Sequence, residues 1–159
     1  LRRFFDIFSF PVIIKEVGQG MGPKSIEAIL RMPIIALELA AHGGTNFSKL
    51  ELLRSTGQQK EMYEPVIGIG HTAGEMIGWI NDILDEYPDD TLCREFIISG
   101  GVRDFLDGYY WMHKVNAPAI YGQASGFLKY AAVSQEALDA YVESQVRGLQ
   151  LANTYLKVK

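Results

Sequence analysis

Apolar residues along the chain fall into short runs that alternate with segments of helical period. The runs at 11–17, 34–40, 96–98 and 118–122 have the length and composition of strands buried on both faces. Each run is followed by a turn that contains glycine and then by a segment expected to be helical. The pattern therefore predicts consecutive strand–helix units with parallel strands and right-handed crossovers.

Helical spacing of the apolar residues marks the segments between these runs. It predicts helices at 23–32, 47–54, 72–87, 104–115, from about 127, and at 135–156. The stretch Ser55–Glu64 is polar and has no period, so we expect an exposed loop there. The last helix is expected to carry one face of Leu138, Tyr141, Val142, Gln145, Leu149, Ala152 and Leu156.

The predicted units are compatible with two architectures. Parallel strands with helical crossovers build either an open doubly wound sheet or part of a (β/α)8 barrel. A whole barrel takes about 250 residues, or roughly 31 for each unit, so this chain has the length of half a barrel. We expect an α/β fold in which residues 1–159 form a single domain of parallel (β/α) units with a long C-terminal helix, and half of a TIM barrel fits its length. The start at Leu1 rather than Met suggests a chain cut from something longer.

Composition and charge narrow the classes of function. With 48% hydrophobic and 21% charged residues, the chain is typical of folded globular proteins. Its net charge of −4, without a basic stripe, argues against a nucleic acid partner. Cys93 is the single cysteine, which excludes an internal disulfide and a cysteine-based zinc site. No apolar run approaches the roughly 18 residues of a membrane span, so we expect a cytoplasmic protein with no membrane partner.

Lys15 stands near the end of the first apolar run. A buried ammonium is costly unless a polar or anionic group faces it. A ligand could supply that group, but Lys15 could also form a structural ion pair with Glu16 or Glu38, or extend its amine to solvent. In barrels the chemistry lies on the loops after the strands, which is where Lys15 is expected.

Glycine-rich turns follow the other three runs, at Gly43-Gly44-Thr45, Gly100-Gly101 and Gly122-Gln123-Ala124. Glycines let backbone N–H groups approach phosphate oxygens, and the following helix adds a positive dipole end. Each turn taken alone also fits a simple tight turn. Because barrels often hold a phosphate in the loops after their last two strands, the last two turns are the phosphate-site candidates.

Four more side chains are of types that can transfer protons, and two of them are candidates for a functional role. Glu51 falls on the helix after the second glycine turn and is either a general acid or base or a solvated surface group. His42 is either a catalytic base or a hydrogen-bonded loop side chain. His71 and His113 are interpreted as structural residues.

The motifs together resemble the C-terminal half of the flavin-dependent, type 2 isopentenyl-diphosphate isomerases. The resemblance rests on VIIKEVGQGM, AAHGGTNFSKLELLR, IISGGVRDFLDG and AIYGQASGF, and it extends over nearly all of the chain. It implies a barrel that binds reduced FMN at its strand ends, uses Mg²⁺ to hold a diphosphate, and receives electrons for the flavin from NADPH. The implied reaction of isoprenoid biosynthesis interconverts isopentenyl and dimethylallyl diphosphate by an allylic proton shift.

The resemblance also implies roles for individual residues. Lys15 matches the lysine at the pyrimidine edge of the flavin, where its charge favours an anionic reduced ring. Thr45 matches a flavin-contacting threonine, and Glu51 matches an acidic residue close to flavin and substrate. Lys15 and Glu51 are therefore the catalytic candidates. The remaining cofactor-binding candidates are Gly100, Gly101 and Val102 in one loop, and Gln123 and Ala124 in the next.

Parts of the resembled family have no counterpart in this chain. The N-terminal half of the family supplies further flavin contacts, basic residues for the diphosphate, and a Gln-Glu pair whose carboxylate binds Mg²⁺. No metal ligand is therefore assigned here, and we expect the chain alone not to turn over the diphosphate substrate. It would pair with a missing N-terminal half, or form a homo-oligomer that covers its open sheet edges.

Two other functions remain as alternatives. His42-Gly43-Gly44 partly fits the histidine loop of FMN-dependent 2-hydroxy-acid oxidases, but Thr45 replaces the arginine that would clamp a carboxylate. The second alternative is a noncatalytic half-barrel that binds a flavin, a phosphate ligand or only a partner chain.

Overall fold

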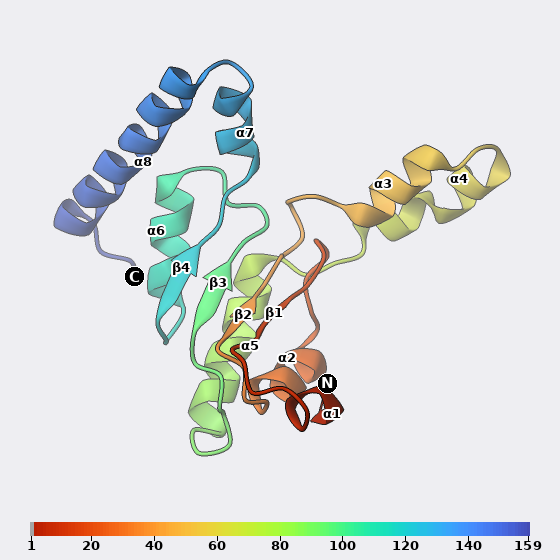
Figure 1. Ribbon diagram of the computed structural model, residues 1–159, viewed down its shortest axis with the longest axis vertical. Helices are drawn as coiled ribbons and strands as arrows, with labels where there is room; N and C mark the ends of the chain where they lie inside the picture. The colour runs from red at the N-terminus through yellow and green to blue at the C-terminus, as the bar shows by residue number, and fades with distance from the viewer. Residues whose placement is uncertain (1) are drawn as a thin grey trace.

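A parallel β-sheet lies at the centre of the computed structural model, which describes residues 2–159 (Figure 1). Its strands are hydrogen-bonded in chain order: β1 (Ile13–Lys15), β2 (Ala36–Glu38), β3 (Phe96–Ile98) and β4 (Ala119–Tyr121). Lys15 is in register with Glu38, Glu38 with Ile97, and Ile97 with Ile120, so the four strands end at nearly the same level. The predicted parallel α/β arrangement is confirmed, although β1, β2 and β4 are shorter than their apolar runs.

Within residues 2–159, eight α-helices connect and flank the strands. They are α1 (Arg2–Phe5), α2 (Pro23–Leu30), α3 (Phe47–Arg54), α4 (Gln58–Tyr63), α5 (Ala73–Glu86), α6 (Phe105–Lys114), α7 (Ser125–Ala131) and α8 (Gln135–Tyr155), with a 3-10 helix, η1 (Glu64–Gly68), after α4. The expected loop at Ser55–Glu64 is wrong, because most of it forms α4 and the start of η1. Good helix formers such as Gln, Lys, Glu and Met make this exposed helix without an apolar period.

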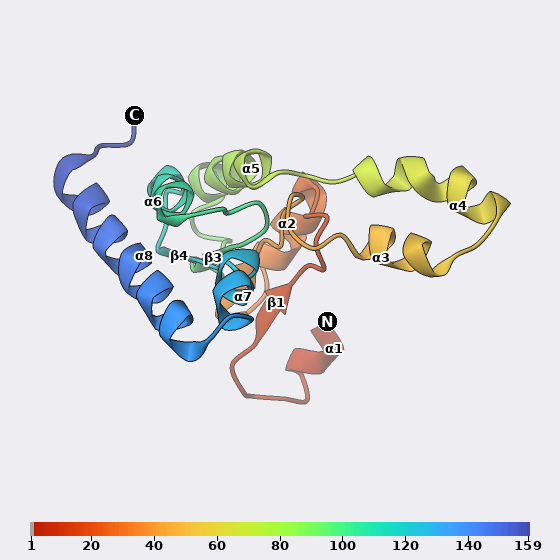
Figure 2. The same cartoon turned by 90° about the horizontal axis from the view of Figure 1, so that it is seen from above.

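One face of the sheet is covered by α2, α5 and α6 (Figure 2). The apolar stripe predicted for α5 is buried there, and its Met76 and Ile80 pack in the same core as Leu37 and Phe96. Thr72 starts α5 with a capping box, in which its hydroxyl accepts from the Glu75 N–H and the Glu75 carboxylate accepts from the Thr72 N–H.

The opposite face of the sheet is exposed at both edges. Ile13 on β1 is 54% exposed and Ile120 on β4 is 62% exposed, although both are apolar and β-branched. Ile14 and Tyr121, which alternate with them along the strands, pack against the core under the helices. A parallel sheet with helices on one face and two open edges is compatible with half of a (β/α)8 barrel.

Two segments extend from the sheet in opposite directions (Figures 1 and 2). On one side α8 lies along α6 and α7 and buries Gln145, Gly148 and Ala152, whereas Val142 and Leu156 of the predicted face are exposed. On the other side α3, α4 and η1 form an arm, residues 47–68. Most large apolar side chains of this arm are exposed, and Leu52 is buried in it.

Candidate functional site

A cavity of about 660 Å³, the strand-end cavity, lies where the four strands finish. The turns after β1, β2, β3 and β4 all contribute to its walls, and its volume is typical of small-molecule sites. The structure brings together in this cavity every cofactor-binding candidate of the sequence: Lys15, Thr45, Gly100, Gly101, Val102, Gln123 and Ala124.

Close packing between the turns explains why several of these positions are glycine. A Cβ atom on Gly100 would lie 2.0 Å from the carbonyl oxygen of Ala41, and one on Gly18 would lie 1.9 Å from that of Thr45. Gly100 also has a φ of +88°, which side chains disfavour. The turns after β1, β2 and β3 therefore stack backbone against backbone.

Two residues of the stacked turns, Gly100 and Gly101, line the strand-end cavity and carry backbone N–H donors. Among the described residues, we find no acceptor for the N–H groups of Gly100 and Gly101. Unpaired backbone N–H groups are strong donors, so these two are suited to an anionic oxygen. The N-terminus of the following helix is not free, because the Asp104 carboxylate accepts from the N–H groups of Leu106 and Asp107 at 2.9 and 3.0 Å.

Lys15 is exposed, which corrects the expectation of a buried amine. Its side chain is 57% exposed and forms an ion pair with Glu38. The reason is that β1 is an edge strand, and Lys15 lies on the same uncovered face of the sheet as Ile13. Burial therefore gives no reason for a ligand anion beside Lys15, whereas its place in the wall of the strand-end cavity does.

Glu38 connects three strands at the strand-end cavity. Its Oε1 accepts from Lys15 Nζ and, at 2.8 Å, from the Ser99 hydroxyl. The Ser99 hydroxyl in turn accepts from the Ala40 N–H at 3.2 Å. From the sequence alone Glu38 was expected only as a partner of Lys15, and Ser99 had no predicted role, since their contact depends on the register of β1, β2 and β3.

Glu16 fixes the turn after β1, a role that was not predicted from the sequence. Its Oε2 accepts from the N–H groups of Gly18, Gln19 and Gly20 at 2.6, 2.7 and 2.9 Å. Partial burial raises the pKa of Glu16, but the backbone hydrogen bonds outweigh it and lower this pKa below its ordinary value. The sequence pattern that could have indicated this turn is an acidic residue followed closely by two glycines.

Glu51 lies outside the strand-end cavity. It stands on α3 in the arm, forms an exposed ion pair with Arg54 at 2.9 Å, and lines a separate hollow of about 220 Å³. Of the two catalytic candidates, Lys15 alone is therefore at the strand-end cavity.

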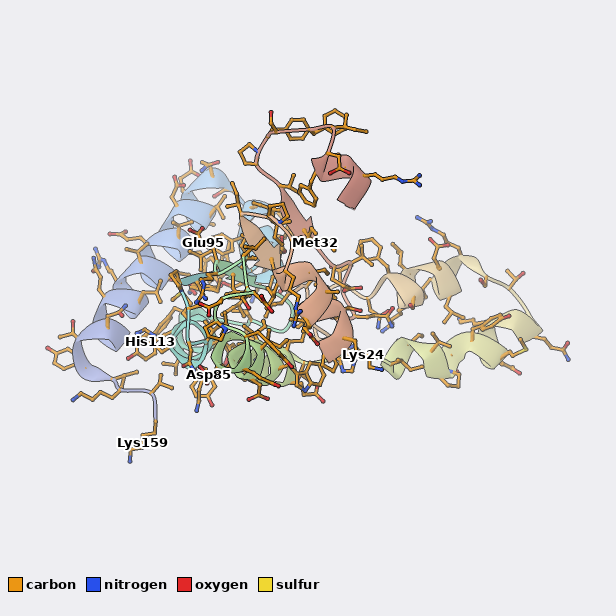
Figure 3. The ribbon with its side chains drawn as sticks, turned by 90° about the horizontal axis from the view of Figure 1, so that it is seen from below. Lys24, Met32, Asp85, Glu95, His113 and Lys159 are labelled. Carbon is orange, nitrogen blue, oxygen red and sulfur yellow. The ribbon has the colours of Figure 1, made fainter. Side chains whose placement is uncertain are left out.

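None of the histidines lines the strand-end cavity. The His42 ring lies beside Gly70, where its Nδ1 is buried without a hydrogen-bond partner among the described residues. His71 precedes the Thr72 cap of α5, and His113 bonds the Tyr109 carbonyl oxygen within α6. Figure 3 views the molecule from below, the side opposite to that of Figure 2, and labels His113 there together with Met32, Asp85 and Glu95. The 2-hydroxy-acid oxidase alternative needs a histidine base at the flavin, and no histidine in residues 2–159 lines the strand-end cavity.

Residues 2–159 contain neither a metal-ligand cluster nor a membrane-spanning helix. No three side chains of His, Cys, Asp or Glu gather closely enough there to hold a metal ion. None of the helices in the same residues combines the length and the apolar character needed to cross a membrane.

No family model matches the chain, but curated relatives do. The isopentenyl-diphosphate delta-isomerases of Rickettsia africae and Rickettsia felis are 28% and 27% identical to it over 152 residues. That of Rickettsia akari is 26% identical over 157 residues. These matches cover 95% of this chain but only 41–42% of the relatives, so the chain spans less than half the length of the proteins it resembles. The names of the relatives state a reaction and no cofactor.

Proposed function

We propose that this chain is the C-terminal, FMN-binding half of a type 2 isopentenyl-diphosphate delta-isomerase of isoprenoid biosynthesis. The observation that carries the proposal is the gathering of all the cofactor-binding candidates, from four separate turns, in the strand-end cavity. Similarity to isopentenyl-diphosphate delta-isomerases over 95% of the chain supports the reaction.

The residues of the strand-end cavity include groups that can bind FMN. Gly100 and Gly101 offer unpaired N–H groups for a phosphate, and the guanidinium of Arg103, paired with Asp107, lies in the same wall. Lys15 offers an ammonium for the anionic reduced ring. When bound and reduced by NADPH, the flavin would supply the proton-transfer group of an allylic isomerisation.

The chain's own residues would bind and orient in this mechanism. Lys15 would bind the negative charge of the ligand, Thr45 contributes to the wall of the same cavity, and Glu16 keeps the first turn in place. The resemblance still makes Glu51 the candidate acid or base, but its position in the arm gives that role less support than Lys15 receives. Gln123 holds the last two turns together, because its amide donates to the Arg103 carbonyl oxygen.

The rest of the barrel would come from a partner. The exposed apolar edges at Ile13 and Ile120 are suited to pairing with further strands. We propose that an N-terminal half supplies those strands, together with the Mg²⁺ ligand and the basic residues for the diphosphate. Self-association through the same edges is the second candidate.

Reconstitution tests the proposal. The chain would be mixed with the N-terminal part of the Rickettsia africae relative, FMN, NADPH, Mg²⁺ and isopentenyl diphosphate, and dimethylallyl diphosphate formation would be followed. We expect turnover only when both halves are present, and a yellow complex with flavin fluorescence changes on binding. No turnover in a flavin-loaded complex of both halves would contradict the isomerase assignment.

A further inference from the structure

We infer that Glu38 sets the charge which the strand-end cavity presents to an anionic ligand, and that Ser99 positions the Glu38 carboxylate. The inference rests on the proposed function, in which that ligand is FMN. It gives roles to two side chains that neither the resemblance nor the relatives' names assign.

The geometry makes Glu38 the fixed member of its ion pair. Lys15 and Glu38 are the last residues of β1 and β2 and lie in register, so both side chains reach the same wall of the cavity. The Glu38 side chain is only 19% exposed, against 57% for Lys15. From the turn after β3, the Ser99 hydroxyl donates to Oε1 of Glu38 and itself accepts from the Ala40 N–H.

This arrangement orients the ammonium but cancels its charge. An ammonium group has three N–H donors, and Glu38 accepts from Lys15 Nζ, so donors remain for a ligand. A ligand anion would therefore meet an oriented donor beside a pair whose net charge is zero. The other cation of the cavity is also paired, since Arg103 contacts both carboxylate oxygens of Asp107 at 2.7 and 3.0 Å.

A purely structural ion pair and a charge-setting pair respond differently when the carboxylate becomes an amide. Glu38→Gln keeps the size and an acceptor oxygen but removes the negative charge, so Lys15 would present a full positive charge. If Glu38 sets the charge, an anion binds the variant more tightly and its binding depends more steeply on salt. If Glu38 serves structure only, binding stays the same or weakens as the turn loosens.

The experiment titrates the purified chain, or its complex with the N-terminal half, with FMN at several salt concentrations. We expect Glu38→Gln to bind FMN on the order of fivefold more tightly at low salt, the effect of one unit charge in a hydrated site. The affinity for reduced FMN should rise more than the affinity for oxidised FMN. Each tenfold rise in the ratio of these two affinities raises the two-electron reduction potential of the flavin by about 30 mV. Lys15→Met should have the opposite effect, and the double variant should return to the wild-type salt dependence.

Two further variants separate positioning and background effects. Ser99→Ala should lie between the wild type and Glu38→Gln, and Ser99→Thr, which keeps the hydroxyl, should restore wild-type binding. Glu143→Gln removes the carboxylate of an exposed Glu–Arg pair on α8, outside the cavity, and should leave FMN binding unchanged. Circular dichroism would verify that each variant is folded.

The outcomes distinguish the inference from the proposed function. If the wild type binds FMN and folded Glu38→Gln binds it equally or more weakly, the charge-setting role is wrong and the FMN site stands. If neither the chain nor its complex binds FMN, both proposals are wrong.

Discussion

Replacing Gly100 by alanine tests how the turns around the strand-end cavity are packed. The added Cβ would lie 2.0 Å from the Ala41 carbonyl oxygen and 2.5 Å from its N atom, so either backbone must move. A φ of +88° costs a non-glycine residue about 1–2 kcal/mol, and overpacking adds about 1–3 kcal/mol. We expect Gly100→Ala to lower the free energy of unfolding by roughly 2–5 kcal/mol.

Two other glycines supply matched controls for this substitution. Gly101 has a φ of +76°, but its nearest neighbour would be 3.5 Å from a Cβ, so Gly101→Ala isolates the backbone term of about 1–2 kcal/mol. Gly78 lies within α5 with no atom within 4 Å of a Cβ, so Gly78→Ala should stabilise the protein by about 0.5–1 kcal/mol.

Urea unfolding of the three variants measures the differences. We expect the midpoint for Gly100→Ala to fall by roughly 1–2 M at an unchanged slope, because the slope reflects the surface exposed on unfolding. Equal costs for Gly100→Ala and Gly101→Ala would refute the close stacking of the turns at 41 and 100, because the contact term would then be absent.

Three further predictions concern binding, pH and assembly. Lys15→Ala should weaken FMN binding by about fivefold, the loss of one hydrated charge, and an unchanged dissociation constant in a flavin titration would contradict its role. Because the folded pKa of Glu16 lies below its ordinary value of 4.5, its contribution to stability is complete above that value and is lost as pH falls through the folded pKa. Urea unfolding of Glu16→Gln should therefore show a smaller acid-induced loss of stability than the wild type, and equal losses would exclude the role of the carboxylate. Ile120→Lys should reduce complex formation with the N-terminal half in size-exclusion chromatography, whereas the same change at the exposed Met62 of the arm should not.

The sequence predicted the order of the elements because apolar runs and helical spacing report burial directly. It also predicted glycine turns directly after the strands, and the turns at 43–45, 100–101 and 122–124 do line one cavity, because the carboxyl ends of parallel strands share one edge of the sheet. The helix at 58–63 was missed because it is exposed and carries no apolar stripe.

The error at Lys15 and the position of Glu51 outside the strand-end cavity have another cause. A run of β-branched residues was interpreted as buried on both faces, whereas β1 is an edge strand with one face uncovered, so Lys15 is exposed. The position of Glu51 depends on the direction in which the arm leaves the sheet, which local sequence does not specify. The contact between Glu38 and Ser99 needs the register of separate strands, which also lies beyond a single-sequence pattern.

Because the strands of residues 2–159 follow one another across the sheet in chain order, each of them pairs only with its neighbours in sequence there. Each βα unit can therefore dock onto the unit synthesised just before it, without waiting for a distant segment. A backbone break between two units would affect at most the one ladder that joins the two strands on either side of the break. Every other ladder would lie within one of the two pieces, and each piece would gain one new sheet edge. Modular growth of this kind makes such sheets tolerant of gene fission, fusion and circular permutation at the unit boundaries.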